Sequence, residues 1–184
     1  MNGDDCHSLC SMFPYSLFLL ALIYREYNPK IKYIRKVELF MTTEIKITNG
    51  FEVLADDESI LVGLNDWDNI PDVLVIPDGI TRIEMYSFSG LPIRKLIIPD
   101  SVTSIGKSAF HACRDLVEVV VGSGVVEIDD EAFGNCTSLE NINIPNSCRR
   151  IGDYAFYGCE NLYPVQVSAF TDWNHSYLKV KGVV

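Results

Sequence analysis

Apolar and polar residues alternate over short segments that recur at nearly even intervals along residues 73–167. In residues 116–121, 139–144 and 162–167, an apolar residue occupies the first, fourth and sixth positions. An alternation with a period of two is typical of a short strand that buries one face. We therefore predict one short strand in each repeat.

These strands belong to a longer phrase that occurs four times, at residues 73–83, 95–105, 118–128 and 141–151. Each strand is followed by a turn-forming step that begins at Pro77, Pro99, Gly122 or Pro145. A second apolar pair comes next, and a phenylalanine follows the last isoleucine of each phrase by five residues. The phenylalanines, which are 22, 23 and 23 residues apart, are Phe88, Phe110, Phe133 and Phe156.

A repeat of this length is too short to bury its own apolar face, so successive repeats must stack on one another. The sequence therefore predicts a solenoid whose short strands form a parallel sheet on one face. We expect Phe110, Phe133 and Phe156 to be buried and stacked in line. In the second coil, the residues expected to point inward are Leu96, Ile98, Val102, Ile105, Ala109, Phe110, Cys113 and Leu116.

Both ends of such a solenoid need cover, because an uncovered end coil exposes apolar side chains and a strand edge. We predict an N-terminal cap over residues 41–72, with strands near 45–47, 51–54 and 60–64 and a polar hairpin turn. Residues 168–184 are expected to cap the other end, with Trp173 and Tyr177 packed against it.

The segment from Ile98 through Ala109-Phe110-x-x-Cys113 to Leu116 resembles the BspA-like, or Treponema pallidum type, leucine-rich repeat. The resemblance covers residues 73–167, with Leu91 in the cysteine position of the first coil and Gly122 in the proline position of the third. It implies a right-handed solenoid and a protein that binds other macromolecules, often as a surface adhesin. It implies no shared catalytic residues.

Residues 1–40 differ from the rest, with a net charge of +1 against −11 for residues 41–184. The uncharged stretch 12–24 is shorter than the roughly 20 residues that span a bilayer. Three explanations stay open for this N-terminal extension. In the first, the natural start is Met41 and the protein is cytoplasmic. In the second, residues 12–36 contact a membrane, and in the third the extension is an ordinary packed or frayed segment. Membrane contact, with a cell-surface location, is the less favoured alternative to the cytoplasmic one.

The amino-acid composition limits which classes of macromolecule are expected to bind the chain. The chain of 184 residues has 25 acidic and 15 basic residues, and this balance argues against nucleic acid, whose phosphates select Lys and Arg. About half of the residues, 48%, are hydrophobic, which is enough for a folded core.

The residues with reactive side chains have structural explanations. Cys113, Cys136 and Cys159 recur every 23 residues, so we predict a ladder of buried free thiols, with Cys148 buried as well. Cys6-His7-x-x-Cys10 lacks the second ligand pair of a zinc site. His111 occupies a position that varies freely between coils, which is typical of a solvated loop. Acidic runs at 56–58 and 129–131 are explained as solvated turns, and we predict no metal, no cofactor and no enzymatic activity.

The outward face of the strands is the remaining candidate for function. If Leu96 and Ile98 point inward, Ile97 points outward. Ile97 and its equivalents in the other coils then form a row along the outer face, and we expect part of this row to be an apolar strip. Its members are Val75, Ile97 and Val120, continued by Asn143 and Gln166, with Val73, Lys95, Glu118, Asn141 and Pro164 in the adjacent row. We predict a module that binds a protein or peptide on this face. The alternative function is a structural or surface-attachment scaffold. The alternative explanation of the exposed β-branched residues is that they only favour strand packing.

Overall fold

The computed structural model describes residues 45–162, 165, 167–169 and 171–173. The predicted N-terminal extension (1–40), with Cys6, His7 and Cys10, lies outside the described residues, as do Pro164, Gln166, Tyr177 and the side chain of Trp173. In the part that is described, no helix is long and apolar enough to cross a membrane. The domain boundaries proposed from the sequence stay predictions.

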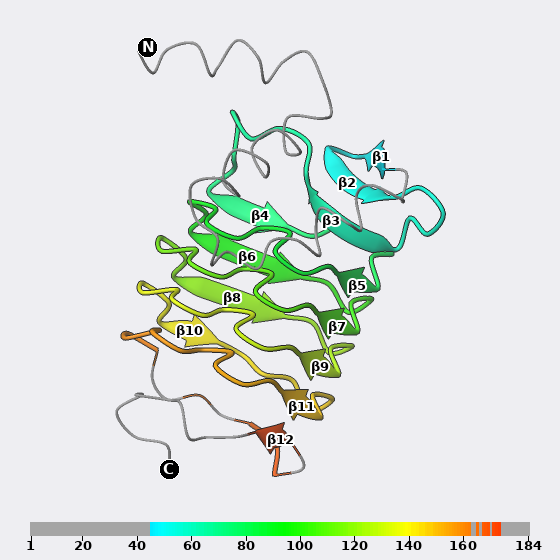
Figure 1. Ribbon diagram of the computed structural model, residues 1–184. Coiled ribbons are helices and arrows are strands. Elements are labelled where there is room, and N and C mark those ends of the chain that lie inside the picture. Colours follow the sequence, from blue (N-terminus) through cyan, green and yellow to red (C-terminus); the bar gives the residue numbers. More distant parts are fainter. Residues whose placement is uncertain (1–44, 163–164, 166, 170, 174–184) are drawn as a thin grey trace, which may run out of the picture. The chain divides into compact units, whose positions relative to one another are not determined.

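The predicted stack of coils is present. Its first sheet is parallel and has the strand order β10-β8-β6-β4, so each strand pairs with its equivalent in the adjacent coil (Figure 1). The strands are β4 (Val73–Val75), β6 (Lys95–Ile98), β8 (Glu118–Val121) and β10 (Asn141–Ile142). Leu96, Ile98, Val119 and Val121 are buried, while the residues between them are more exposed. The period-two alternation therefore identified the buried face correctly.

The prediction of one strand per coil was wrong, because each coil contributes a second short strand (Figure 1). In four of these strands an isoleucine enters the core and the residue before it faces outward; these isoleucines are Ile83, Ile105, Ile128 and Ile151. Their backbone groups pair with the coils on either side. For example, the Thr103 amide donates to the Thr81 carbonyl at 2.8 Å, and the Gly106 amide donates to Ile83 at 2.9 Å. The strands are β5 (Arg82–Ile83), β7 (Ser104–Ile105), β9 (Glu127–Ile128), β11 (Arg150–Ile151) and β12 (Asp172–Trp173).

The second sheet continues into the three strands predicted for residues 45–64. β1 (Ile45–Thr48), β2 (Phe51–Leu54) and β3 (Ile60–Leu64) pair in antiparallel order, and β3 then pairs in parallel with β5. The Glu84 amide donates to the Leu61 carbonyl at 2.8 Å, and Leu61 is fully buried. These strands therefore supply backbone hydrogen-bond partners to the first coil, on the side where the other coils pair with a preceding repeat.

Leu162, Val165 and Val167, the described residues of the strand predicted at 162–167, belong to no strand. In the preceding coil the amide of Asn141 donates to Val117 at 3.2 Å. The equivalent residue of the next coil is Pro164, which has no N–H to donate. β10 is the last strand of the first sheet among the described residues, and the next equivalent position holds a residue that cannot donate this hydrogen bond.

A third ladder of backbone hydrogen bonds runs along the loop side, which we define as residues 86–90 and their equivalents 108–112, 131–135 and 154–158. Three amides of one coil donate to the next, as in Ser108 to Asp130, Phe110 to Ala132 and Ala112 to Gly134, at 2.7 to 2.9 Å. Each loop contains two residues with left-handed backbone angles, four positions apart. They are Tyr86 and Gly90, Ser108 and Ala112, Glu131 and Asn135, and Tyr154 and Gly158. The same conformation recurs although the residue types differ, so coil stacking imposes it.

Three phenylalanines stack along the core as predicted, and Phe88 extends the row to the first coil. Phe88, Phe110, Phe133 and Phe156 are at most 2% exposed, their neighbouring ring centroids lie 5.2, 5.3 and 5.7 Å apart, and the rings are within 11° of parallel. Offset stacking at these separations adds to the free energy gained by burying the rings. The row fixes the register of four successive coils.

The predicted cysteine ladder is also present, with free thiols at Cys113, Cys136, Cys148 and Cys159. Cys113, Cys136 and Cys159 donate to the carbonyls of Phe88, Phe110 and Phe133, at 3.2, 3.1 and 3.1 Å. Each thiol therefore joins two coils. The adjacent Cys113 and Cys159 thiols, and then burial, raise the pKa of Cys136 well above its usual value.

The turn with Gly122 in place of proline approaches the preceding coil closely. A Cβ atom at Gly122 would lie 2.4 Å from the Pro99 carbonyl carbon, and one at Gly124 would lie 1.9 Å from the Asp100 oxygen. The Ser123 amide, between them, donates to the Asp100 carboxylate at 2.6 Å. The two glycines are therefore required by packing between these turns.

We expect Phe133→Ala to lower the free energy of unfolding by about 3 to 5 kcal/mol, because it empties a fully buried ring site between two stacked neighbours. Chemical denaturation measures this change. Val126→Ala, at a position that is 44% exposed, is the control and should change stability by less than about 0.5 kcal/mol. A loss below about 1 kcal/mol for Phe133→Ala would contradict the stacking argument.

We expect Ala112→Gly to raise the free energy of unfolding by up to about 1 kcal/mol, because a non-glycine residue is strained at its φ of 58°. Ala109→Gly, in the same loop but without a left-handed angle, should lower stability instead. Thermal and urea unfolding of both variants provides the comparison. Equal destabilisation by the two substitutions would show that the left-handed position stores no strain.

The buried thiols should be unreactive in the folded protein, because burial excludes reagents from all four, and the raised pKa of Cys136 also keeps that thiol protonated. Cys6→Ser with Cys10→Ser removes the cysteines outside the described residues. With Ellman's reagent this variant should show no fast-reacting thiol when folded and four after unfolding. Rapid modification of any thiol in the folded state would contradict the ladder.

Candidate binding surface

The structure brings three of the predicted binding residues together on the outer face of the first sheet. Val75 pairs in register with Ile97, and Ile97 pairs with Val120. Val75 is 52% exposed, Val120 is 36% exposed and Ile97 is half-buried. Val73, which is 44% exposed, lies next to them. These four residues form a contiguous apolar patch, which we call the apolar strip.

A charged pair borders the apolar strip. Lys95 and Glu118 are partners in the register of β6 and β8, and the Lys95 Nζ lies 2.8 Å from a Glu118 carboxylate oxygen. Both side chains are partly exposed, so the pair adds at most about 1 kcal/mol to stability. Its main consequence is to place one positive and one negative group beside the apolar residues.

Asn143 has a structural contact that the sequence did not reveal. Its side-chain oxygen accepts the Val121 amide proton at 2.9 Å, and its side-chain nitrogen donates to the Val121 carbonyl at 2.9 Å. In the earlier coils a main-chain carbonyl has this function, as Ile97 has toward the amide of Ile76. The Asn143 side chain therefore replaces strand pairing beyond β10, and a partner would meet an amide that already has two hydrogen bonds.

The acidic run 129–131 is not merely solvated, as the sequence suggested, because it forms ion pairs with two cations. Arg150 lies 3.3 Å from the carboxylate of Asp129 and contacts Glu127, while Lys107 lies 3.6 Å from Asp130. The hydrogen bond to Glu127 is the largest cause of the raised pKa of Arg150. These contacts tie neighbouring coils together at the edge of the second sheet.

The described residues give little basis for catalysis or metal binding. His111 has its Nε2 atom 3.0 Å from the Asn135 side-chain nitrogen, whereas a general base is usually oriented by a carboxylate or carbonyl. Within the ranges that the structure describes, no three His, Cys, Asp or Glu side chains gather as a metal site.

Two exposed tyrosines on the loop side were not singled out from the sequence. Tyr154 is 40% exposed and Tyr157 is 50% exposed, and both belong to the last complete loop. A comparison of the equivalent positions Ser89, His111, Gly134 and Tyr157 could have identified Tyr157, because a glycine there lies between two large side chains, but it does not include Tyr154.

Comparison with known proteins agrees with this geometry. A family model described as BspA type leucine-rich repeat region matches residues 69–178 in six copies. No curated protein is similar enough to this chain to count as a match.

Several solved structures are similar. A leucine-rich repeat protein from Bacteroides capillosus is 23% identical with a TM-score of 0.56, over 68% of this chain and 99% of that one. The T. pallidum leucine-rich repeat protein is 25% identical with a TM-score of 0.52, over 69% of this chain and 61% of that one. A leucine-rich repeat protein from Bacteroides ovatus is 23% identical with a TM-score of 0.50, over 65% of this chain and 38% of that one.

Proposed function

The chain belongs to the BspA-type leucine-rich-repeat family, and from this we propose that it is a non-catalytic module that binds a protein or peptide. Leucine-rich-repeat domains generally mediate protein interactions. Stacked repeats suit this function, because they offer an extended surface on a rigid scaffold. We place the contact on the outer face of the first sheet.

The observation that carries the proposal is the apolar strip. Val73, Val75, Ile97 and Val120 are adjacent and partly or largely exposed, although a monomeric protein seldom leaves such residues grouped in water. Preference for strand geometry explains their β-branched side chains individually, but it does not require them to be contiguous. A partner that covers the strip would bury apolar area at its centre and meet Lys95 and Glu118 at the rim.

Binding should depend on very few residues, since interface energy concentrates where water is excluded. Ile97 lies between Val75 and Val120 in the register and is the centre of the patch. Charges introduced at Ile97 and Val120 would oppose burial there. They would leave the core unchanged because both side chains point away from Leu96 and Val119.

We expect Ile97→Glu with Val120→Lys to retain the thermal melt and to lose at least tenfold in affinity, about 1.4 kcal/mol, for peptides selected against the wild-type protein. The opposite charges are cross-strand partners, which offsets any loss of sheet stability. Peptides would come from an unbiased display library, with affinities measured by calorimetry and stability by circular dichroism.

The matched control is Val126→Lys, which places a charge at a valine that is 44% exposed, next to β9 in the second sheet. Peptides that bind the strip should keep their affinity for this variant. If most selected peptides bind the double variant as tightly as the wild type, the strip is not the preferred contact surface. If the peptides bound only the Val126→Lys control more weakly, the contact surface would lie on the second sheet instead.

A further inference from the structure

The loop side of the solenoid has a hollow of about 270 Å³ that belongs to no part of the apolar strip. Three successive coils line it, through His111, Glu131, Gly134, Asn135, Tyr154 and Tyr157. We propose that this hollow binds one neutral saccharide residue. The proposal adds a second, small-ligand site to the protein-binding function and does not depend on it.

A departure from the repeat creates the hollow. Equivalent positions of the four loops hold Ser89, His111, Gly134 and Tyr157, so the third coil has no side chain between an imidazole and a phenol ring. A Cβ atom at Gly134 would lie only 3.1 Å from His111 Cδ2. The Gly134 carbonyl accepts the Ala112 amide proton at 2.7 Å, which fixes the backbone floor. The space is therefore formed by the fold before any ligand binds.

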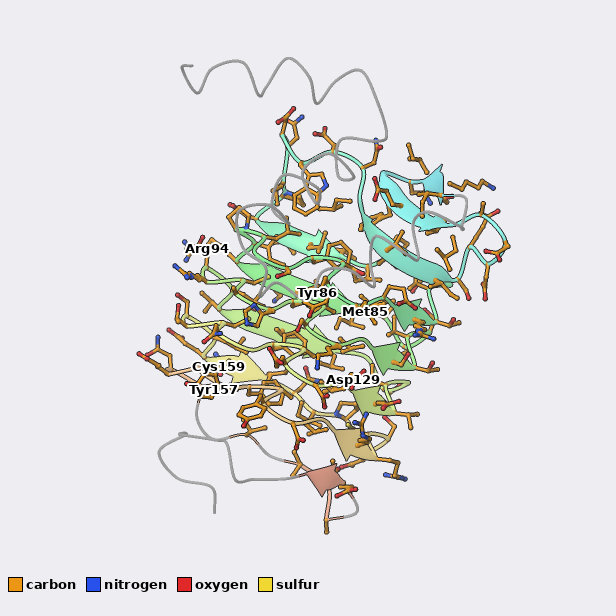
Figure 2. The ribbon with its side chains drawn as sticks, in the orientation of Figure 1. Met85, Tyr86, Arg94, Asp129, Tyr157 and Cys159 are labelled. Carbon is orange, nitrogen blue, oxygen red and sulfur yellow. The ribbon has the colours of Figure 1, made fainter. Side chains whose placement is uncertain are left out.

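Aromatic rings form one wall. The centroids of Tyr154 and Tyr157 lie 5.9 Å apart with an interplanar angle of 81°, so one ring packs edge-on against the other. Both tyrosines line the hollow, this packing restricts how their rings can turn, and the two residues remain 40% and 50% exposed. The C–H face of a sugar ring is apolar and flat enough to pack on an aromatic face. Figure 2 shows Tyr157 on the lower coils, near Cys159.

Polar groups of mixed character form the opposite wall. The Asn135 side-chain nitrogen lies 3.0 Å from His111 Nε2, which orients both groups, and the Glu131 carboxylate accepts hydrogen bonds only. Hydroxyl groups both donate and accept, so a ligand with several hydroxyls fits a carboxylate, an amide and an imidazole side by side. An apolar ligand would displace water from these groups without replacing its hydrogen bonds.

Charge favours a neutral ligand over a cation or an anion. Glu131 contributes the one carboxylate among the lining residues, and its oxygen lies 4.0 Å from the Lys107 ammonium, which offsets much of its charge. The lining residues include no Lys or Arg, and the chain carries a net charge of −10, so an anion would be repelled. A saccharide without charge meets neither obstacle.

The test uses the full chain, labelled with ¹⁵N, and three probes: methyl α-glucoside, methyl β-galactoside and N-acetylglucosamine. At least one should shift the amide signals of Gly134, Asn135 and Tyr157 saturably, with a Kd of about 1 mM, the usual scale of a small polar ligand with few contacts. We expect Tyr157→Ala and Gly134→Ser to weaken this binding at least tenfold. Gly134→Ser refills the space with the residue that the first coil carries at Ser89.

Tyr86→Ala is the control, because Tyr86 occupies the position equivalent to Tyr154 in the first coil, away from the hollow. It should leave the Kd unchanged, and thermal melts should show that all three variants fold. The proposal is overturned if no glycoside shifts the loop signals, or if Tyr157→Ala and Gly134→Ser bind as tightly as the wild type. If butylammonium, a cation, shifted these signals and no sugar probe did, the proposed ligand class would be wrong.

Discussion

Hydrogen bonding between coils is the constraint on which the rest of this structure depends. Strand and loop-side backbone groups of one coil find their partners in the next coil, in two sheets and in the loop-side ladder. Because an unpaired buried backbone group costs about as much as a lost hydrogen bond, no coil is stable by itself. The stacked phenylalanines and the thiols that donate to their carbonyls follow from this spacing, since equivalent residues are brought into contact once per coil.

The same constraint explains the ends of the sheets. At the N-terminal side, the antiparallel strands β1 to β3 offer carbonyls to the first coil, so that β5 has a partner without a preceding repeat. Toward the other end, Asn143 supplies side-chain atoms where the strand stops, and Pro164 cannot donate at the next equivalent position. Among the described residues the first sheet stops at β10, while the second continues to β12.

Positions that agree between coils build the core, and positions that differ create surface features. Gly122 and Gly124 allow one turn to approach its neighbour, and Gly134 leaves space between His111 and Tyr157. On the strand face, the outward row changes from apolar at Val75, Ile97 and Val120 to polar at Asn143. Specific binding in a repeat protein depends on such differences, because identical coils would present the same surface at every level.

The sequence alone determined the coil length, the buried residues and the face on which the apolar strip lies. Burial of Leu96, Ile98 and Phe110 followed from period-two alternation and from the 22- and 23-residue spacings, which are local properties of the chain. It did not reveal the second sheet, because a two-residue strand such as Ser104–Ile105 is too short for periodicity to register and exists only through its neighbours. The Asn143 bonds, the pairing of Arg150 with Asp129 and the hollow at Gly134 join residues about 20 or more positions apart. Only the tertiary structure decided these contacts, because they depend on how closely one coil lies on the next.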